Sequence, residues 1–351
     1  MVPDKENQET CDSNVQEKTI NESTISDIPM KHCFSTTTSS TGCVGVDSGT
    51  FKLFAGAWGE RGVRKYMEDT HIVCPSIYKL ISVNDSNFPE CFDAAVFAIF
   101  DGHGGKQTSV FCRDNLITEI GEKLMNLYSE VPVDEFFYTD RHVRKLLRKV
   151  LDGLNARIAA EMPSCKDGTT VIISFFPYRQ CSTIMYIASL GDTAAYLSRV
   201  SKGVEQSIPL NEMHKPWMVN EKARIVQAGG VVESGRVNGL LEVSRSLGDL
   251  SLKKYGVTSC PSFTKLTINY TMDNFILLGC DGFWINWTAV EALTKAKELL
   301  FKESRRLITQ GDKDPFPNLE NICQDLVNHV LLEKKSQDNV TVILIYIKKK
   351  K

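Results

Sequence analysis

The sequence predicts a protein built from both β-strands and α-helices, because apolar runs of strand length alternate with amphipathic stretches of helical length from Phe51 onward. The apolar runs contain so few polar positions that they predict strands buried within the molecule. They are "AAVFAIF" (94–100), "TVIISFF" (170–176), "TIMYIASL" (183–190), "NFILLGC" (274–280) and "NVTVILIYI" (339–347).

The amphipathic stretches predict helices over 106–128, 141–161, 220–228, 288–308 and 319–334. The first of them begins just after Gly104-Gly105, and the third ends at Gly229-Gly230, which is a typical signal for the end of a helix. Polar segments at 84–90 and 310–318 predict surface loops, and Lys348–Lys351 predict a solvated end.

Composition excludes several classes of protein. The 351 residues are 42% hydrophobic and 24% charged, as in ordinary globular proteins. Lys+Arg number 41 against 43 Asp+Glu, so the net charge of -2 gives no field that would attract nucleic acid or an anionic membrane. No apolar run approaches the ~20 residues of a membrane span. We therefore expect a monomer without nucleic-acid or membrane partners.

The cysteines indicate the compartment. There are 11, an odd number, and no two have the C-x-x-C spacing of a zinc ribbon or a redox motif. Scattered, unpaired spacing predicts reduced thiols and therefore a cytoplasmic or nuclear protein.

Residues 1–50 differ in composition from the rest of the chain. They are polar and rich in Ser and Thr, as in "FSTTTSSTG", and contain few aromatic residues. Such a segment cannot bury enough apolar surface to offset the entropy lost on ordering. We expect a disordered tail over 1–50 followed by one domain over 51–351.

Acidic residues recur at the ends of the predicted strands. Three runs end in aspartate: "VFAIFD" at Asp101, "YIASLGD" at Asp192 and "FILLGCD" at Asp281. Asp338 directly precedes the last strand, and Glu68-Asp69 precede "THIVCPSIY". An isolated charge at the rim of a buried strand is unfavourable, so converging carboxylates need cations to offset their repulsion. Oxygen ligands of this kind suit Mg²⁺ or Mn²⁺.

Glycine and histidine follow two of these aspartates. Gly102 and Gly282 have no Cβ, so the backbone there can approach an ion closely. His103, two residues after Asp101, is a candidate proton donor. Asp-Gly also marks ordinary turns, and we interpret Asp167-Gly168 as one of these.

The sequence lacks the residues that other hydrolytic mechanisms need. Cys280 precedes Asp281, but no arginine follows at a spacing that would hold a phosphate beside a nucleophilic thiol. The chain contains no G-x-S-x-G, Walker A, strand-linked G-x-G-x-x-G or H-E-x-x-H motif. Metal-assisted hydrolysis is the chemistry that remains.

The order of the motifs resembles a known family, the metal-dependent protein serine/threonine phosphatases of type 2C (the PPM family). The resemblance covers roughly 52–347. Its motifs are "RKYMED", "FDGHGG", "DGTT", "LGDTAAYL", "HKP", "EKARIVQAGG", "RVNGLLEVSRSLGD", "CDGFW" and "QDNVTVI".

The resemblance implies an α+β fold, a four-layer α-β-β-α sandwich of two central antiparallel sheets flanked by helices. It also implies a binuclear Mg²⁺ or Mn²⁺ centre and a weak third metal. Asp101 would bridge both metals, Asp281 and Asp338 would complete the shell of one, and Glu68 and the Gly102 carbonyl would hold the other. Asp69 would belong to the same acidic cluster, and Asp192 would help to hold the third metal.

The activity implied by the resemblance is hydrolysis of phosphoserine and phosphothreonine in phosphoprotein substrates by a metal-bridging hydroxide, without a phosphoenzyme. Arg64 would bind the phosphate and His103 would protonate the departing oxygen. The segment from about 214 to 260 would form the flap that shapes substrate access. Within it, "RVNGLLEVSRSLGD" contributes no evident metal ligand, so we interpret it as scaffold.

Two positions depart from the family pattern. Ala194 stands where the family has an arginine, and Ile285 stands where it has an aspartate. Both lie near the expected third metal. The alternatives are therefore a pseudophosphatase that serves as a phosphoprotein-binding or regulatory module, and a metal-dependent phosphohydrolase for small molecules or nucleic acid.

Overall fold

The structure is a computed structural model, and it describes residues 44–350 except 129, 133–135, 178–181 and 311–315. Most of the expected tail, 1–43, therefore lies outside the described residues, as does part of the expected loop 310–318. Order within the described chain begins before Phe51, because Val44–Asp47 form a strand. No helix among the described residues has the length and apolar character needed to cross a membrane.

The strands are short and almost all antiparallel to their neighbours. They are β1 (Val44–Asp47), β2 (Phe51–Glu60), β3 (Thr70–Cys74), β4 (Ala95–Phe100), β5 (Gly102–His103), β6 (Gly168–Thr169), β7 (Val171–Phe176), β8 (Ile184–Leu190), β9 (Ala194–Ser201), β10 (Val204–Pro209), β11 (Val232–Glu233), β12 (Arg236–Val237), β13 (Leu247–Gly248), β14 (Ser262–Thr267), β15 (Asp273–Gly279) and β16 (Val340–Lys349).

Helices connect and cover the strands. They are α1 (Ile77–Ile81), the 3-10 helix η1 (Glu90–Phe92), α2 (Gln107–Tyr128), α3 (Asp140–Glu161), α4 (Val219–Gln227), α5 (Leu250–Lys253), α6 (Asp281–Trp284), α7 (Ala289–Thr309) and α8 (Leu319–Leu332).

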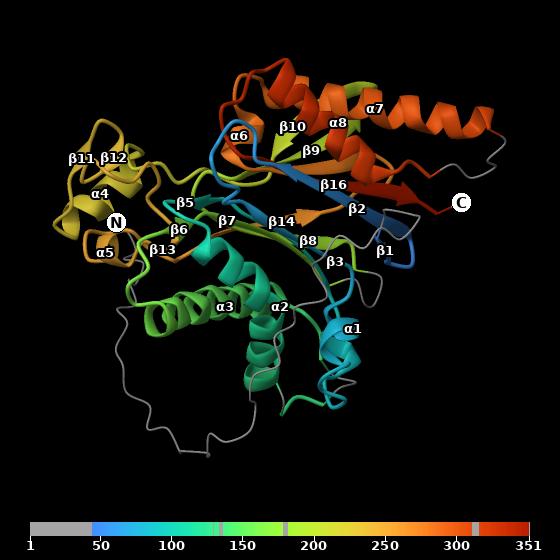
Figure 1. The fold of residues 1–351 in the computed structure, drawn as a ribbon. Helices are drawn as coiled ribbons and strands as arrows, with labels where there is room; N and C mark the ends of the chain where they lie inside the picture. The colour runs from blue at the N-terminus through green and yellow to red at the C-terminus, as the bar shows by residue number, and fades with distance from the viewer. Residues whose placement is uncertain (1–43, 129, 133–135, 178–181, 311–315, 351) are drawn as a thin grey trace, which may run out of the picture. The chain divides into compact units, whose positions relative to one another are not determined.

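Two large sheets form the centre of the domain. One has the order β1-β2-β16-β15-β9-β10 and the other the order β14-β8-β7-β4-β3, with antiparallel pairing throughout. Figure 1 shows α7 and α8 over the first sheet and α1, α2 and α3 beneath the second. This arrangement confirms the expected α+β fold with a four-layer sandwich.

The main hydrophobic core includes residues of both sheets and continues to the buried faces of α7 and α8. Alternate residues of β2 (Phe51, Leu53 and Ala55) contribute from one side, and Phe97 and Ile99 of β4 contribute from the other. Because side chains alternate across a strand, the remaining residues of β4 face the helices of the outer layer. All six residues of β4 are buried, which explains why its sequence shows no alternation.

The outer layer packs closely on the first sheet at one glycine. A Cβ placed on Gly56 of β2 would lie 2.5 Å from the backbone carbon of Leu319 at the start of α8. Glycine there lets the helix approach the strand directly. The N-terminus of α7 is fixed separately by a capping box, in which Thr288 and Glu291 satisfy each other's backbone amides.

Every helix and strand expected from an amphipathic or fully apolar stretch is present, with shifts of one or two residues at the ends. The expected solvated end at Lys348–Lys351 is wrong in part, because β16 continues through Lys349 and pairs with the beginning of β2. The ammonium group of Lys348 lies over the ring of Phe316, and that of Lys350 pairs with Asp47.

The segment from 214 to 260 contains α4, β11, β12, β13 and α5 and has a small core of its own. The buried side chains of this core are Ile225, Val237, Leu241, Val243, Leu252 and Val257.

Candidate metal centre

Strand direction gathers the acidic residues at one edge of the sandwich. β4 and β8 both pair antiparallel with β7, so their C-terminal ends, followed by Asp101 and Asp192, lie on the same side of the sheet. In the other sheet β15 ends just before Asp281, and β16 begins just after Asp338. These two strands are antiparallel neighbours, so the end of one meets the beginning of the other.

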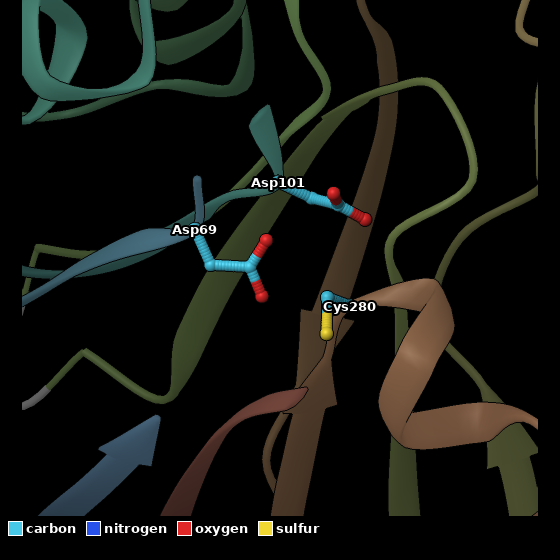
Figure 2. A group of neighbouring side chains, drawn as sticks. All are labelled: Asp69, Asp101 and Cys280. Carbon is cyan, nitrogen blue, oxygen red and sulfur yellow. The ribbon is translucent and has the colours of Figure 1, made fainter. Parts of the chain in front are cut away.

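Two groups of side chains are close enough to share an ion. Potential ligand atoms of Asp101, Asp192 and Asp281 all lie within 4.8 Å of one another, and the same holds for Asp69, Asp101 and Cys280. Asp101 belongs to both groups, and its Oδ2 lies 3.4 Å from the backbone nitrogen of Asp281. Figure 2 shows Asp69 and Asp101 on adjacent segments above Cys280. Four of the expected ligands therefore lie in two adjoining groups that share Asp101.

Crowding of these carboxylates shifts their protonation. Burial, together with repulsion from three neighbouring aspartates, raises the pKa of Asp101 well above its ordinary value. Burial, opposed by a hydrogen bond from Thr341, raises the pKa of Asp69 to about 7. Burial and the charges of Asp192 and Asp338 raise the pKa of Asp281 to about 6. A divalent cation would offset both the burial of these charges and the repulsion between them.

Cys280 is not placed as a nucleophile. It is fully buried, its Sγ lies 3.5 Å from the carbonyl oxygen of Asn339, and it accepts a hydrogen bond from the backbone nitrogen of Thr341. Burial and the nearby aspartates raise the pKa of the Cys280 thiol well above its ordinary value. The thiol therefore stays protonated, which agrees with the exclusion of a cysteine mechanism from the sequence.

Glu68 and Gly102 lie beside this cluster. The carbonyl oxygen of Glu68 accepts a hydrogen bond from Ser109, and a Cβ on Gly102 would lie 2.4 Å from that same oxygen. Only glycine allows the two segments to approach each other this closely. Burial raises the pKa of the Glu68 carboxyl, and the charge of Asp338 adds to the shift.

Arg64 is oriented towards Asp338. Its Nη2 donates a hydrogen bond to Asp338 Oδ2 at 2.6 Å, and its Nε donates one to the carbonyl oxygen of Gln337 at 3.1 Å. The Arg64 side chain is 58% exposed, so it is free to bind an external anion as well. The arginine expected to bind phosphate thus lies next to an expected metal ligand.

The donor set fits Mg²⁺ or Mn²⁺. Its members are carboxylate and carbonyl oxygens, and the one sulfur among them is held as a protonated thiol. Three carboxyls have raised pKa values that a bound cation would lower, and glycine at 102 lets its segment lie directly against Glu68.

A family model described as protein phosphatase 2C matches residues 56–340, which is most of the chain. The chain belongs to the protein phosphatase 2C family. This match confirms the family resemblance found in the motifs.

Curated relatives cover the phosphatase 2C domain. The mouse protein named integrin-linked kinase-associated serine/threonine phosphatase 2C is 32% identical over 295 residues, which cover 82% of this chain and 70% of the mouse protein. A Paramecium tetraurelia protein named probable protein phosphatase 2C 6 is 31% identical over 308 residues, which cover 82% of this chain and 90% of that protein.

Solved structures show the same phosphatase 2C fold. A serine-threonine phosphatase 2C from Toxoplasma gondii superposes with a TM-score of 0.65 at 20% identity, covering 87% of this chain and 98% of that one. A C. elegans sex determining protein superposes with a TM-score of 0.63 at 23% identity, covering 83% of this chain. The match spans 64% of the C. elegans chain, which is less than two thirds of its length.

Three polar residues of this phosphatase 2C domain escaped the sequence analysis, and Asn339 is the first. Its Oδ1 accepts from the Glu68 backbone nitrogen at 2.8 Å, and its Nδ2 donates to the carbonyl oxygens of Arg61 and Tyr66 at 2.9 and 3.0 Å. Asn339 therefore fastens the segment that carries Arg64 and Glu68. No local pattern marks it, because its partners are far away in the sequence.

Lys215 is the second. Its Nζ lies 2.5 Å from Asp192 Oδ2, so an ammonium group stands at the carboxylate expected to help hold a third metal. Lys215 belongs to the "HKP" motif, which is typical of the family but does not by itself reveal the contact with Asp192.

Asp249 is the third, and it contacts the expected proton donor. His103 Nε2 lies 2.8 Å from Asp249 Oδ2. Burial lowers the pKa of His103, but the hydrogen bond to Asp249 and the surrounding aspartates outweigh it, and the pKa is raised. Asp249 follows Leu-Gly as Asp192 does, so the recurrence of "LGD" was the signal available in the sequence.

The interpretation of Asp167-Gly168 as an ordinary turn is wrong. Asp167 is buried and accepts a hydrogen bond from the backbone nitrogen of Gln107 at 2.8 Å, which fixes the beginning of α2. Gly168 lies within β6, where it pairs with His103 and with Gly248. Both residues are structural elements of the site.

Proposed function

We propose that this protein hydrolyses phosphoserine and phosphothreonine in phosphoprotein substrates, using two Mg²⁺ or Mn²⁺ ions and no phosphoenzyme. The observation that supports this most directly is the convergence of Asp69, Asp101, Asp192 and Asp281, from four separate segments, at one edge of the sandwich. Burial, with repulsion from neighbouring aspartates added, raises the pKa values of Asp69, Asp101 and Asp281, and bound cations would favour the charged forms again.

The proposed ligands follow the family assignment. Asp101 would bridge two ions, with Asp281 and Asp338 on one side and Glu68 and the Gly102 carbonyl on the other. Asp69 would belong to the same acidic cluster, next to Asp101. The hydroxyl of Thr341 donates a hydrogen bond to Asp69 Oδ2 at 2.7 Å. Two divalent ions bound there would supply a nucleophilic water near neutral pH and neutralise charge on the phosphoryl oxygens.

The chain's own side chains then bind and protonate the substrate. Arg64 is 58% exposed and contacts Asp338 through one nitrogen, so we propose that it exchanges part of this contact for the substrate phosphate. His103 would donate a proton to the departing serine or threonine oxygen, which is a poor leaving group without that proton.

One titration tests the proposal. Mn²⁺ is added to the full-length protein, and phosphate release is measured from a phosphothreonine peptide, a phosphotyrosine peptide and a nucleotide, with Asp101→Asn prepared in parallel as the control. We expect Mn²⁺-dependent release from the phosphothreonine peptide first and none from the control. Faster release from the nucleotide would point to a small-molecule phosphohydrolase.

The second candidate is a pseudophosphatase that binds phosphoproteins without turnover. The pairing of Lys215 with Asp192 and the residues Ala194 and Ile285 favour it, since all three concern the expected third metal. Binding of the phosphothreonine peptide without any release at saturating Mn²⁺ would select this candidate.

The proposal also covers the oligomeric state, location and domain organisation of the protein. We propose a monomer of the cytosol or nucleus, consisting of a catalytic domain with a flap over about 214–260 and a polar tail before it. The balanced charge and the scattered cysteines of the sequence support this assignment.

A further inference from the structure

A small sheet beside the metal centre aligns residues from three distant parts of the chain. Its strands are β5, β6 and β13, in the order β13-β6-β5. His103 pairs with Gly168, and Gly168 pairs with Gly248, so these three residues form one row across the sheet. Asp249 directly follows that row.

The missing side chain in the middle of the row makes room for a contact above it. A Cβ on Gly168 would lie 2.1 Å from Asp249 Oδ2 and 2.6 Å from His103 Nε2. With glycine at this position the two side chains meet at 2.8 Å. Asp249 is only 5% exposed, and Ser246 donates a second hydrogen bond to the same Oδ2 at 2.6 Å.

The backbone of Asp249 is held in an unusual conformation. Its φ of 48° and ψ of 40° are left-handed, a region that costs a non-glycine residue free energy. Its backbone nitrogen donates to the carbonyl oxygen of Asp167 at 3.0 Å, which helps to hold it there. The left-handed turn directs the carboxylate back over Gly168 towards His103.

A purely local role does not account for this carboxylate. Asp249 precedes α5, where an aspartate side chain would ordinarily cap the first turn of the helix. Its side chain makes no such capping hydrogen bond. The carboxylate is committed to His103 and Ser246 instead.

We propose that Asp249 is a positioning residue for His103. It accepts the hydrogen bond from Nε2–H, fixes the plane of the ring, and leaves Nδ1 as the nitrogen that faces the substrate. In the transfer the bond between phosphorus and the serine oxygen breaks as the phosphoryl group passes to water, and its electron pair goes to that oxygen. The Nδ1–H bond breaks, an O–H bond forms on the serine oxygen, and the ring becomes neutral with its remaining proton on Nε2. This inference rests on the proposed function of His103 as the proton donor.

The test compares two leaving groups at saturating Mn²⁺. A serine oxygen needs a proton on departure, whereas the nitrophenolate of p-nitrophenyl phosphate does not. We expect Asp249→Asn to lower kcat on a phosphoserine peptide by ~10²-fold and on p-nitrophenyl phosphate by only about threefold, with KM for the peptide unchanged. A variant that only disturbed the fold would lower both rates alike.

A double-mutant cycle shows whether Asp249 acts through His103. His103→Ala removes the proposed donor, so adding Asp249→Asn to it should cause no further loss on the phosphoserine peptide. If the double variant is slower than His103→Ala by the full factor that Asp249→Asn causes alone, Asp249 acts independently and the proposal is overturned.

Two buried serines supply a matched pair should Asp249→Asn fail to fold. Ser246 donates to Asp249 and Ser244 donates to the Glu221 carboxylate, and both are fully buried. Ser246→Ala should lower the ratio of peptide to p-nitrophenyl phosphate turnover severalfold, and Ser244→Ala should leave it unchanged. Equal ratios in the two variants would overturn the proposal.

The outcomes separate this inference from the proposed function. If the unaltered protein releases phosphate from neither substrate, the proposed function fails. If it releases phosphate from both and the ratio is insensitive to residues 246 and 249, only the role of Asp249 fails.

Discussion

Single carboxylates carry the clearest consequence of the crowded centre. Asp281 has a pKa of about 6 in the fold, above the ~3.9 of an unfolded aspartate, so its charge opposes folding near neutral pH in the absence of metal. We predict that Asp281→Asn raises the melting temperature in EDTA while it removes turnover. The loss of turnover should exceed the ~10–100-fold cost of losing an outer-shell partner of a metal.

Melting in EDTA and phosphate release at saturating Mn²⁺ measure the two effects. Asp273→Asn serves as a control, since Asp273 is a buried aspartate of β15 paired with Arg199 and lies outside the acidic cluster. This control should lower the melting temperature. Substantial turnover by Asp281→Asn would falsify its role as a ligand.

Ile285 is the second residue at which the structure sharpens a prediction. It is 43% exposed and lies at the end of α6, four residues after Asp281. An aspartate there would not bury a charge, so packing gives little reason for the isoleucine. We predict that Ile285→Asp lowers the Mn²⁺ concentration at half-maximal activity by about tenfold, because an added carboxylate can hold metal-bound water.

The control for Ile285→Asp is Val290→Asp, which makes a similar apolar-to-acidic change at another exposed position. It should leave the Mn²⁺ midpoint unchanged. The Mn²⁺ dependence of the melting temperature measures metal affinity a second time, independently of activity. If Ile285→Asp lowers the melting temperature in EDTA but leaves the Mn²⁺ midpoints of activity and of melting temperature unchanged, the isoleucine is a packing residue.

Among the elements, β1 shows where the domain begins. It pairs with β2, Val46 is 3% exposed, and Asp47 lies 2.5 Å from Lys350 Nζ near the other end of the described chain. A truncation that removes residues 1–48 deletes this strand and exposes the edge of β2. A truncation that removes residues 1–43 keeps it.

We predict different results for the two truncations. Removing residues 1–43 should leave kcat/KM on a phosphothreonine peptide and the melting temperature unchanged, since that polar segment offers no core or ligand. Removing residues 1–48 should cost about 2 kcal/mol of unfolding free energy from lost burial. In a domain of this size that cost lowers the melting temperature by several degrees. A large loss of activity in the shorter truncation would show that the segment docks on the domain.

The elements found from sequence are those whose signal is local. β4 and β7 are buried on both faces, and their sequences are therefore apolar at every position except Ser174 of β7. β10 lies at the edge of its sheet and is mostly exposed, so its sequence "VEQSIP" has no apolar pattern to detect. Its strand conformation comes from pairing with β9, which is a tertiary effect.

The same distinction holds within the site. The acidic ligand candidates were found because each stands at the end of an apolar run, which is visible within a few residues. Asp249 and Asn339 act on His103 and Glu68, which lie far from them in the sequence. Spacing cannot reveal such partners, and only the sheet formed by β5, β6 and β13 brings the first pair together.

Over the whole molecule, the acidic cluster couples metal binding to pH. The pKa of Asp69 is about 7 and that of Asp281 about 6, both above the ~3.9 of an unfolded aspartate. Between about pH 3.9 and pH 7 the metal-free folded protein therefore binds more protons than the unfolded chain. Its stability from these groups is thus fully present near pH 4 and is lost as the pH rises through 6 and 7.

Metal binding runs in the opposite direction, because a divalent ion needs the deprotonated carboxylates and must displace protons at low pH. We predict that the difference in melting temperature between Mn²⁺-loaded and EDTA-treated protein widens from about pH 5 to about pH 7.5. His71 and His214, whose pKa values burial lowers to about 4, titrate in both samples and cancel in the difference. Asp281→Asn removes one of the titrating carboxyls, so its difference should widen less over the same range. A difference that stays constant with pH in the unaltered protein would mean that the cluster holds no protons for the metal to displace.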